Sequence, residues 1–148
     1  MDISKMLVDN EEAVANLYRA YASRFRNYAD FWNLMAKDEM THANIARRCR
    51  DELAEGLLQL DEKGFNKEAL NAYSDYLKRE LRAAGERRLS LIHALSTTFY
   101  IEQSLIEARF FEVYKGGSEK LKKSMSQHRI IESEHCERIR MLLASFKV

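Results

Sequence analysis

The chain contains no proline and only five glycines in 148 residues. Proline and glycine interrupt helices most strongly, so their scarcity leaves long stretches in which helices can continue. Alanine, leucine, glutamate, lysine and arginine dominate the composition, and all five favour helices. These features predict an all-α protein, and the length predicts a single domain over residues 1–148.

Cysteine is also scarce, because Cys49 and Cys136 are the only two and they form no C-x-x-C pair. A rubredoxin-type or zinc-ribbon module needs four cysteines in two close pairs, so the composition excludes both. The start of the sequence lacks the basic and apolar pattern of a signal peptide. Two distant thiols in such a chain predict a reducing, cytoplasmic location.

Long apolar runs and an excess of one charge are missing as well. No run of eighteen apolar residues occurs, so we expect no membrane-spanning helix. The formal net charge is +1, with acidic and basic residues interspersed. A surface for nucleic acid or for an anionic membrane would need a strong basic excess, so we expect neither partner.

The chain carries two Glu-x-x-His steps, each preceded by another glutamate 28 or 30 residues upstream. Residues three apart on a helix lie on one face, so the carboxylate and imidazole of a step can point at one metal ion. Four carboxylates and two imidazoles form the ligand set of a di-iron or di-manganese site in a four-helix bundle. The predicted ligands are Glu11, Glu39, His42, Glu102, Glu132 and His135.

Apolar residues at three- and four-residue steps predict four long helices, over about 3–26, 28–60, 86–114 and 119–146. The break between the first two is so short that these helices should be antiparallel neighbours. Residues 65–85 have a helical pattern of their own and predict a long, partly helical crossover between the second and third helices. The expected fold is an antiparallel four-helix bundle with this crossover.

The six predicted ligands fall on the apolar faces of these helices, where an unpaired charge is unfavourable. In the first helix two glutamates compete, but Glu11 aligns with Val14 and Tyr18 whereas Glu12 does not. Four converging carboxylates would repel one another without cations. Oxygen-rich ligation with one imidazole per ion suits iron(II) or manganese(II) better than zinc or copper. We therefore expect two metal ions, iron or alternatively manganese.

Several further side chains have weaker support as parts of the site. His128 lies one turn before Glu132 on the same face, and it is either an extra ligand or a hydrogen-bonded core histidine. Tyr18, Tyr21 and Tyr100 are candidates for redox activity, although aromatic residues at helical spacing are usually core. Each ligand histidine needs an acceptor for its other ring nitrogen, which the sequence does not identify.

The pattern ExxVxxLY at residues 11–18 and the step DEMTH at residues 38–42 resemble the rubrerythrin-type di-iron domain of the ferritin-like superfamily. The resemblance extends over residues 11–49 and 99–138 and leaves out the crossover. It implies a ferritin-like bundle that oxidises Fe(II), or reduces O2 or peroxide, at a di-iron centre. The electron donor for such a reaction is not indicated by the sequence.

The sequence therefore predicts a dinuclear metal protein with the redox chemistry of a ferroxidase- or peroxidase-type oxidoreductase. The metal ligands would carry the chemistry, and no further catalytic residue or organic cofactor is indicated. Two other interpretations stay open. One is a non-catalytic module that stores or senses metal, and the other is a helical dimerisation scaffold. We expect a homodimer.

Overall fold

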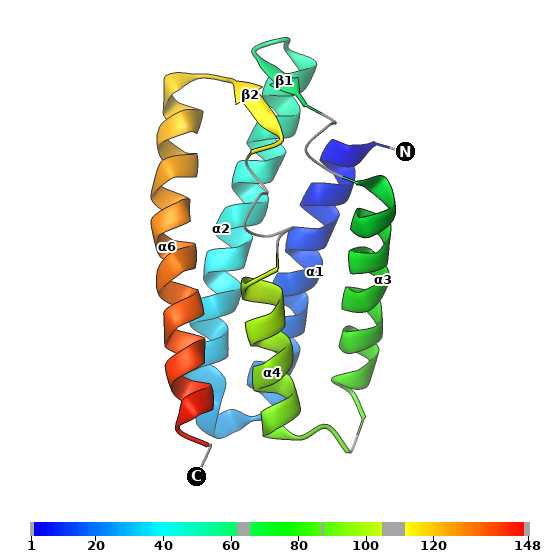
Figure 1. Ribbon diagram of the computed structural model, residues 1–148, viewed down its shortest axis with the longest axis vertical. Helices are drawn as coiled ribbons and strands as arrows, with labels where there is room; N and C mark the ends of the chain where they lie inside the picture. Colours follow the sequence, from blue (N-terminus) through cyan, green and yellow to red (C-terminus); the bar gives the residue numbers. More distant parts are fainter. Residues whose placement is uncertain (1, 62–65, 87, 105–111, 147–148) are drawn as a thin grey trace.

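Helices make up most of the computed structural model, which describes residues 2–61, 66–86, 88–104 and 112–146 (Figure 1). The fold is all-α apart from a small two-stranded sheet, as the composition predicts. Within the described residues, no helix combines the length and apolar character needed to cross a membrane. The elements are α1 (Ile3–Arg24), a 3-10 turn (Arg26–Tyr28), α2 (Ala29–Ala54), β1 (Leu58–Leu60), α3 (Lys67–Ala83), α4 (Leu91–Glu102), β2 (Tyr114–Gly116) and α6 (Glu119–Ala144).

Several helices begin at a polar side chain that accepts hydrogen bonds from backbone N–H groups of the first turn. These N-caps satisfy donors that have no partner inside the helix. They are Asp2 for α1, Asn66 for α3, Ser90 for α4 and Ser118 for α6. Immediately before Ser118, Gly117 has φ +96°, and a Cβ atom there would lie 3.0 Å from Leu58 Cδ1. Glycine is therefore required where the chain turns into α6.

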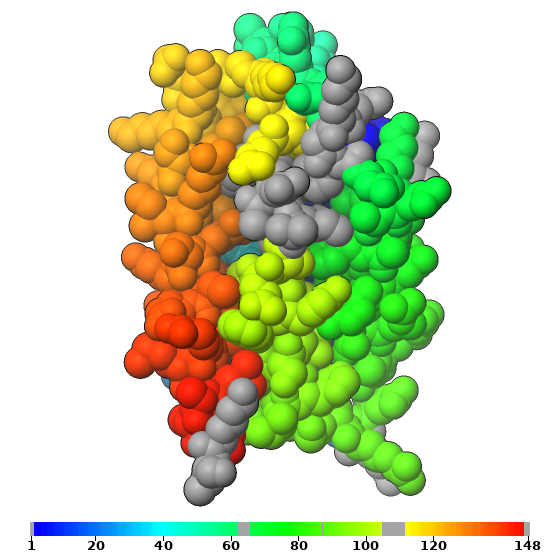
Figure 2. All heavy atoms as spheres, viewed as in Figure 1, coloured from blue at the N-terminus to red at the C-terminus, as the bar shows by residue number. Residues whose placement is uncertain are grey.

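The helices lie side by side with alternating directions along the long axis (Figure 1). α1 and α2 are antiparallel and packed together, with only the 3-10 turn between them. α3 packs along α1 and carries the chain back to the opposite end, so α4 runs parallel to α2. α6 then packs against α2 and α4. Seen as spheres, α4 lies between α3 and α6 on one face of the molecule (Figure 2).

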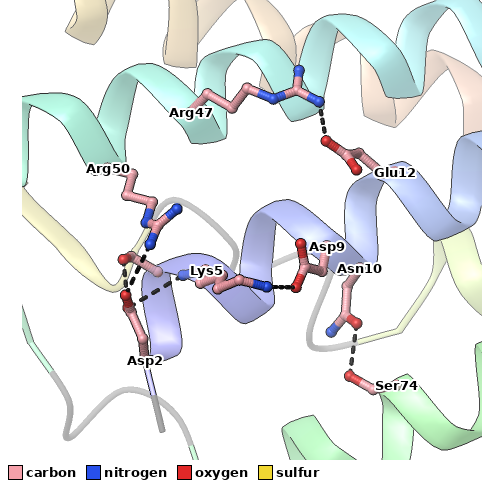
Figure 3. A network of polar contacts seen from close by, with 9 residues as sticks. Asp2, Lys5, Asp9, Asn10, Glu12, Arg47, Arg50 and Ser74 are labelled. Atoms are coloured by element: carbon pink, nitrogen blue, oxygen red, sulfur yellow. Dashed lines mark hydrogen bonds and ion pairs between the residues drawn. The ribbon is translucent and has the colours of Figure 1, made fainter.

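The core consists of two buried clusters along this long axis. The larger one is rich in aromatic residues and includes Tyr18, Tyr21 and Trp32. The second cluster includes Leu7 and Cys49, close to the end where α2 meets the sheet. Polar contacts also join neighbouring helices, since the Ser74 hydroxyl on α3 donates to Asn10 Oδ1 on α1 at 2.7 Å (Figure 3).

The predicted end of the second helix is wrong. α2 ends at Ala54, and residues 58–60 form β1 instead of two further helical turns. Gly56 adopts φ +79°, a left-handed conformation that ends the helix. β1 then pairs antiparallel with β2, with Leu58 opposite Gly116 and Leu60 opposite Tyr114.

The limits predicted for the third helix also need correction. α4 begins at Leu91 after its Ser90 cap, not at residue 86, and Tyr114–Gly116 form β2. Residues 105–111 of the predicted helix lie outside the described residues. Among the described residues of the crossover there is one helix, α3, of 17 residues. Its length lets it span the molecule along α1, as Figure 1 shows.

Candidate metal centre

The structure brings the six predicted ligands to one buried region between four helices. α1 and α4 supply one carboxylate each, while α2 and α6 supply one Glu-x-x-His step each. Five of the six residues are buried, and the sixth, Glu132, keeps 17% of its side chain exposed. Together they are Glu11, Glu39, His42, Glu102, Glu132 and His135.

Three carboxylates converge on one nitrogen of His42. Its Nδ1 atom lies 3.0 Å from Glu11 Oε2 and 3.1 Å from Glu132 Oε1, on α1 and α6 respectively. Glu39 Oε2, one turn away on the same helix, lies at 3.7 Å. Glu11, Glu39 and His42 each place a ligand atom within 4.8 Å of the others. We call this group the His42 position, because the three atoms can share one cation.

A second group of predicted ligands also contains Glu39. Glu39, Glu102 and His135 also offer ligand atoms within 4.8 Å of one another, and we call this group the Glu102 position. The Nδ1 atom of His135 lies 4.0 Å from Glu102 Oε2. Glu39 belongs to both positions, so its carboxylate lies where it can bridge two ions. Each position then has one imidazole of its own.

Two residues outside this set hold its members in place. His135 Nε2–H donates to Asp38 Oδ2 at 2.5 Å, which leaves Nδ1 directed towards Glu102. The Tyr18 hydroxyl donates to Glu102 Oε1 at 2.6 Å inside the core. Such partners fix the tautomer and the orientation of metal ligands.

Asp38 is the residue that sequence reasoning missed. Asp38 directly precedes Glu39 on the helix, and consecutive side chains on a helix point about 100° apart. That turn carries Asp38 away from the centre of the site and towards His135 on α6. The sequence alone does not show that α6 lies on this side of α2.

His128, left open between ligand and core histidine, lies beside the His42 position. It is 2% exposed, and its ring centroid lies 4.0 Å from that of His42. Its Nε2 atom is 3.5 Å from Glu132 Oε1. His42, His128 and Glu132 form a third group of ligand atoms within 4.8 Å of one another.

Burial makes two of the carboxylates hold their protons. Burial first, and the neighbouring Glu11 second, raise the pKa of Glu39 to about 8. Burial and the charge of Glu39 raise the pKa of Glu102 well above its usual value, although the Tyr18 hydrogen bond opposes the shift. Like charges and a low dielectric both disfavour ionisation. Without cations, the core neutralises its own negative charge by binding protons.

Glu132 and His42 shift in the directions that favour a charged pair. Burial alone would raise the pKa of Glu132, but His128 and His42 outweigh it and lower that pKa to about 2. Burial likewise opposes protonation of His42, yet the Glu11, Glu132 and Glu39 carboxylates raise its pKa well above the usual value. The His42 imidazolium therefore occupies the place that a cation would take among these carboxylates.

The two adjacent glutamates of α1 point in different directions, and only one of them points towards the predicted ligands. Glu11 is 1% exposed and its carboxylate lies against His42. Glu12 points away from the core and forms an ion pair with Arg47 of α2 (Figure 3). Glu11 alone belongs to the buried group, as its alignment with Val14 and Tyr18 predicts.

Of the three tyrosines considered for redox activity, Tyr18 forms a hydrogen bond with a predicted ligand. Tyr18 bonds to Glu102. Tyr21 packs against Trp32 with ring centroids 5.3 Å apart, as a core aromatic residue would. Tyr100 is 53% exposed and contacts Tyr76 edge-on at the surface.

The donor set fits a pair of divalent cations that accept carboxylate oxygen and imidazole nitrogen. Glu39 Oε2 and His135 Nδ1 are buried and make no hydrogen bond within the described part of the chain. Glu39 belongs to both positions and His135 to the Glu102 position, so a cation bound there would give these atoms a direct ligand contact. Comparison with models of protein families, with curated proteins and with solved structures gives no match.

Proposed function

We propose that this chain is a dinuclear metal protein of the ferritin-like, rubrerythrin type that oxidises Fe(II) or reduces O2 or peroxide. Its cofactor would be a pair of iron ions, or one manganese and one iron. The observation that carries the proposal is that Glu39 is shared by two buried groups, each with its own imidazole. A purely structural salt bridge would need only one partner for Glu39, so it would not account for the group of Glu39, Glu102 and His135.

The path of the chain supports the ferritin-like part of the proposal. Ferritin-like bundles have one long connection and carry Glu-x-x-His motifs on two of their helices. Here α3 is the long connection, and the two steps lie on α2 and α6. The remaining carboxylates come from α1 and α4, so each helix of the proposed bundle contributes to the site.

The protein residues divide into ligands and supports. Glu11 and His42 would hold one ion, Glu102 and His135 would hold the other, and Glu39 would bridge them. Glu132 would be a second bridge or a terminal ligand, because its Oε1 atom faces His42 from α6. Bound iron would supply the electrons for reaction with O2 or peroxide.

The chain's own contribution would be orientation, proton handling and exclusion of water. Asp38 holds the imidazole of His135 with Nδ1 towards the site. Glu39, with its pKa raised to about 8, would give up its proton when a cation arrives. The Tyr18 hydroxyl keeps a proton 2.6 Å from Glu102 Oε1. Val14 and Leu17 lie on the same helix as Glu11, and because both are 0% exposed they help to exclude water from this region.

Anaerobic titration with Fe(II), followed by exposure to oxygen, tests the proposal. We expect two Fe(II) per chain, and then loss of chelatable Fe(II) together with uptake of O2. Glu11→Ala should lose at least one of the two ions. Glu12→Ala is the matched control and should behave as the wild type, because Glu12 pairs with Arg47 on the outside.

Other outcomes would favour the alternative interpretations. Binding of Fe(II) without oxidation by O2 or peroxide would indicate a storage or sensing module. Absence of binding, together with a stability increase in Glu39→Ala and Glu132→Ala, would indicate a helical scaffold. Such an increase is expected when buried acids serve no ligand, because their removal relieves desolvation and repulsion.

A further inference from the structure

His128 lies next to the proposed pair of ions and is not needed to complete it. It lies on α6 one turn before Glu132 and is 2% exposed. Its Nε2 atom approaches Glu132 Oε1 to 3.5 Å, the same oxygen atom that lies 3.1 Å from His42 Nδ1. Two imidazoles from different helices therefore meet at one carboxylate oxygen.

The surroundings of His128 suit a neutral imidazole that binds a cation. Its ring lies 4.0 Å from the ring of His42, at 43°, so two protonated imidazoles would repel each other here. Neutral imidazole is the form in which histidine ligates metals. Its ligand atom lies within 4.8 Å of those of His42 and Glu132.

We propose that His128 is a third imidazole ligand, so that the two metal positions are chemically different. This inference rests on the function proposed above. The His42 position would have two imidazoles together with Glu11, Glu39 and Glu132, whereas the Glu102 position would have one imidazole together with Glu39 and Glu102. Imidazole-rich sites favour cobalt, zinc and iron over manganese, and oxygen-rich sites accept manganese. The extra imidazole would therefore make Co(II), Zn(II) and Fe(II) bind more tightly at the His42 position than at the Glu102 position.

A groove between α2 and α6 borders His128. His128 lines it together with Thr41 and Ile45 of α2 and Gln127 of α6. Its volume is about 220 Å³, enough for a few water molecules or for a small oxidant. Ions and small ligands in this groove would therefore contact His128.

Cobalt(II) reports the proposed difference without any turnover. X-ray absorption of protein loaded with two Co(II) counts imidazoles, and we expect three per pair of ions, from His42, His128 and His135. In His128→Ala the count should fall to two per pair, and the tighter Co(II) affinity should fall by at least about ten-fold. Mn(II) should bind the Glu102 position as before, because His128 is not part of it.

The matched control is His93→Ala, which removes an exposed histidine that pairs with Glu80 on the surface. It should leave the imidazole count and both affinities unchanged. His128→Gln keeps the side-chain size while removing the ring, and it serves if the alanine variant is unstable. The wild-type imidazole count needs no variant and is decisive by itself.

The outcomes separate this inference from the proposed function. Two bound ions with only two imidazoles per pair would overturn the role of His128 and leave the dinuclear site intact. Unchanged Co(II) affinity in His128→Ala would do the same. Failure of the wild type to bind any metal would overturn both proposals together.

Discussion

The two histidines of the Glu-x-x-His steps both point their Nδ1 atom towards the candidate metal centre. Both present Nδ1 to carboxylates, and the other ring nitrogen of His135 bonds to Asp38. The two steps differ in sequence at this place, because the residue before Glu132 is Ile131, where the first step has Asp38. The two halves of the site are therefore related but not identical.

Replacing Asp38 with Asn tests whether it orients His135. An amide accepts a weaker hydrogen bond than a carboxylate and leaves the ring less basic, so metal affinity should fall by about 10- to 100-fold. The fall should concern one ion of the two, measured by Co(II) titration. Asp51→Asn, an exposed position on the same helix, is the control. Equal affinities in both variants would remove Asp38 from the site.

Replacing Tyr18 with Phe tests the hydrogen bond to Glu102. The bond opposes the rise in the pKa of Glu102, so without it the carboxyl holds its proton more firmly against an incoming ion. We expect weaker metal binding and a loss of about 1–3 kcal/mol in the free energy of unfolding, since a buried acceptor loses its donor. Chemical denaturation measures the second effect. Tyr100→Phe, at an exposed position, should change neither quantity.

Most of the candidate site was predictable residue by residue, because helical spacing separates a buried glutamate from an exposed one. Glu11 and Glu12 differ by one position, and only the first aligns with apolar neighbours. The supporting contacts were not predictable in this way. Asp38 and Tyr18 act across helices, so their roles depend on how the helices are placed relative to one another.

Among the elements, the periodic pattern predicted the helices but not all of their ends. An extended α2 would have buried Leu57, which is 56% exposed, whereas Leu58 is buried in β1. The strand forms because Leu58 pairs with Gly116, a residue far along the chain. A local pattern does not contain such a pairing. The same limit applies to the start of α4, which follows its Ser90 cap and not residue 86.

The contact between α2 and α4 gives a prediction at the element scale. Trp32 Nε1–H on α2 donates to Thr98 Oγ1 on α4 at 3.1 Å, and both residues are fully buried. Thr98→Val keeps the shape but removes the acceptor, so unfolding should require about 1–3 kcal/mol less. Trp32 is the only tryptophan, so its fluorescence follows the urea transition. An unchanged midpoint relative to Ser96→Ala, an exposed control on α4, would show that the bond contributes nothing.

For the whole molecule, the buried acids predict an unusual dependence of stability on pH. The pKa of Glu39 is raised from 4.5 to about 8, so the metal-free folded protein binds more protons than the unfolded chain between these values. Its stability should therefore fall as pH rises from about 5 to 8, by on the order of a few kcal/mol. The raised pKa of His42 acts in the same direction. Below pH 4.5 the lowered pKa of Glu132 acts oppositely, so stability falls again on acidification.

Thermal melting across this pH range measures the effect. Glu39→Gln removes the titrating group, so its melting temperature should change much less between pH 5 and 8. Bound metal should reverse the trend, because deprotonated ligands bind cations more tightly as pH rises. A metal-free wild type whose stability rises steadily from pH 5 to 8 would contradict the raised pKa of Glu39.

The overall class of the molecule followed from composition, since a proline-free chain rich in helix-forming residues has few alternatives to an all-α fold. The direction of α4 also agrees with expectation, because a long crossover must return the chain before a parallel helix can begin. The sharing of Glu39 between two groups depends on how α1, α4 and α6 are placed around α2, which a local sequence pattern does not contain. The homodimer and the cytoplasmic location stay predictions.

The central claim is that Glu39 joins two metal positions in the core. Anomalous X-ray scattering from crystals of the protein loaded with Fe(II) or Mn(II) tests it most directly. We predict two peaks per chain, one contacting Glu11 and His42 and the other contacting Glu102 and His135, with Glu39 touching both. A single peak that Glu39 does not share, or peaks confined to surface carboxylates, would contradict the account.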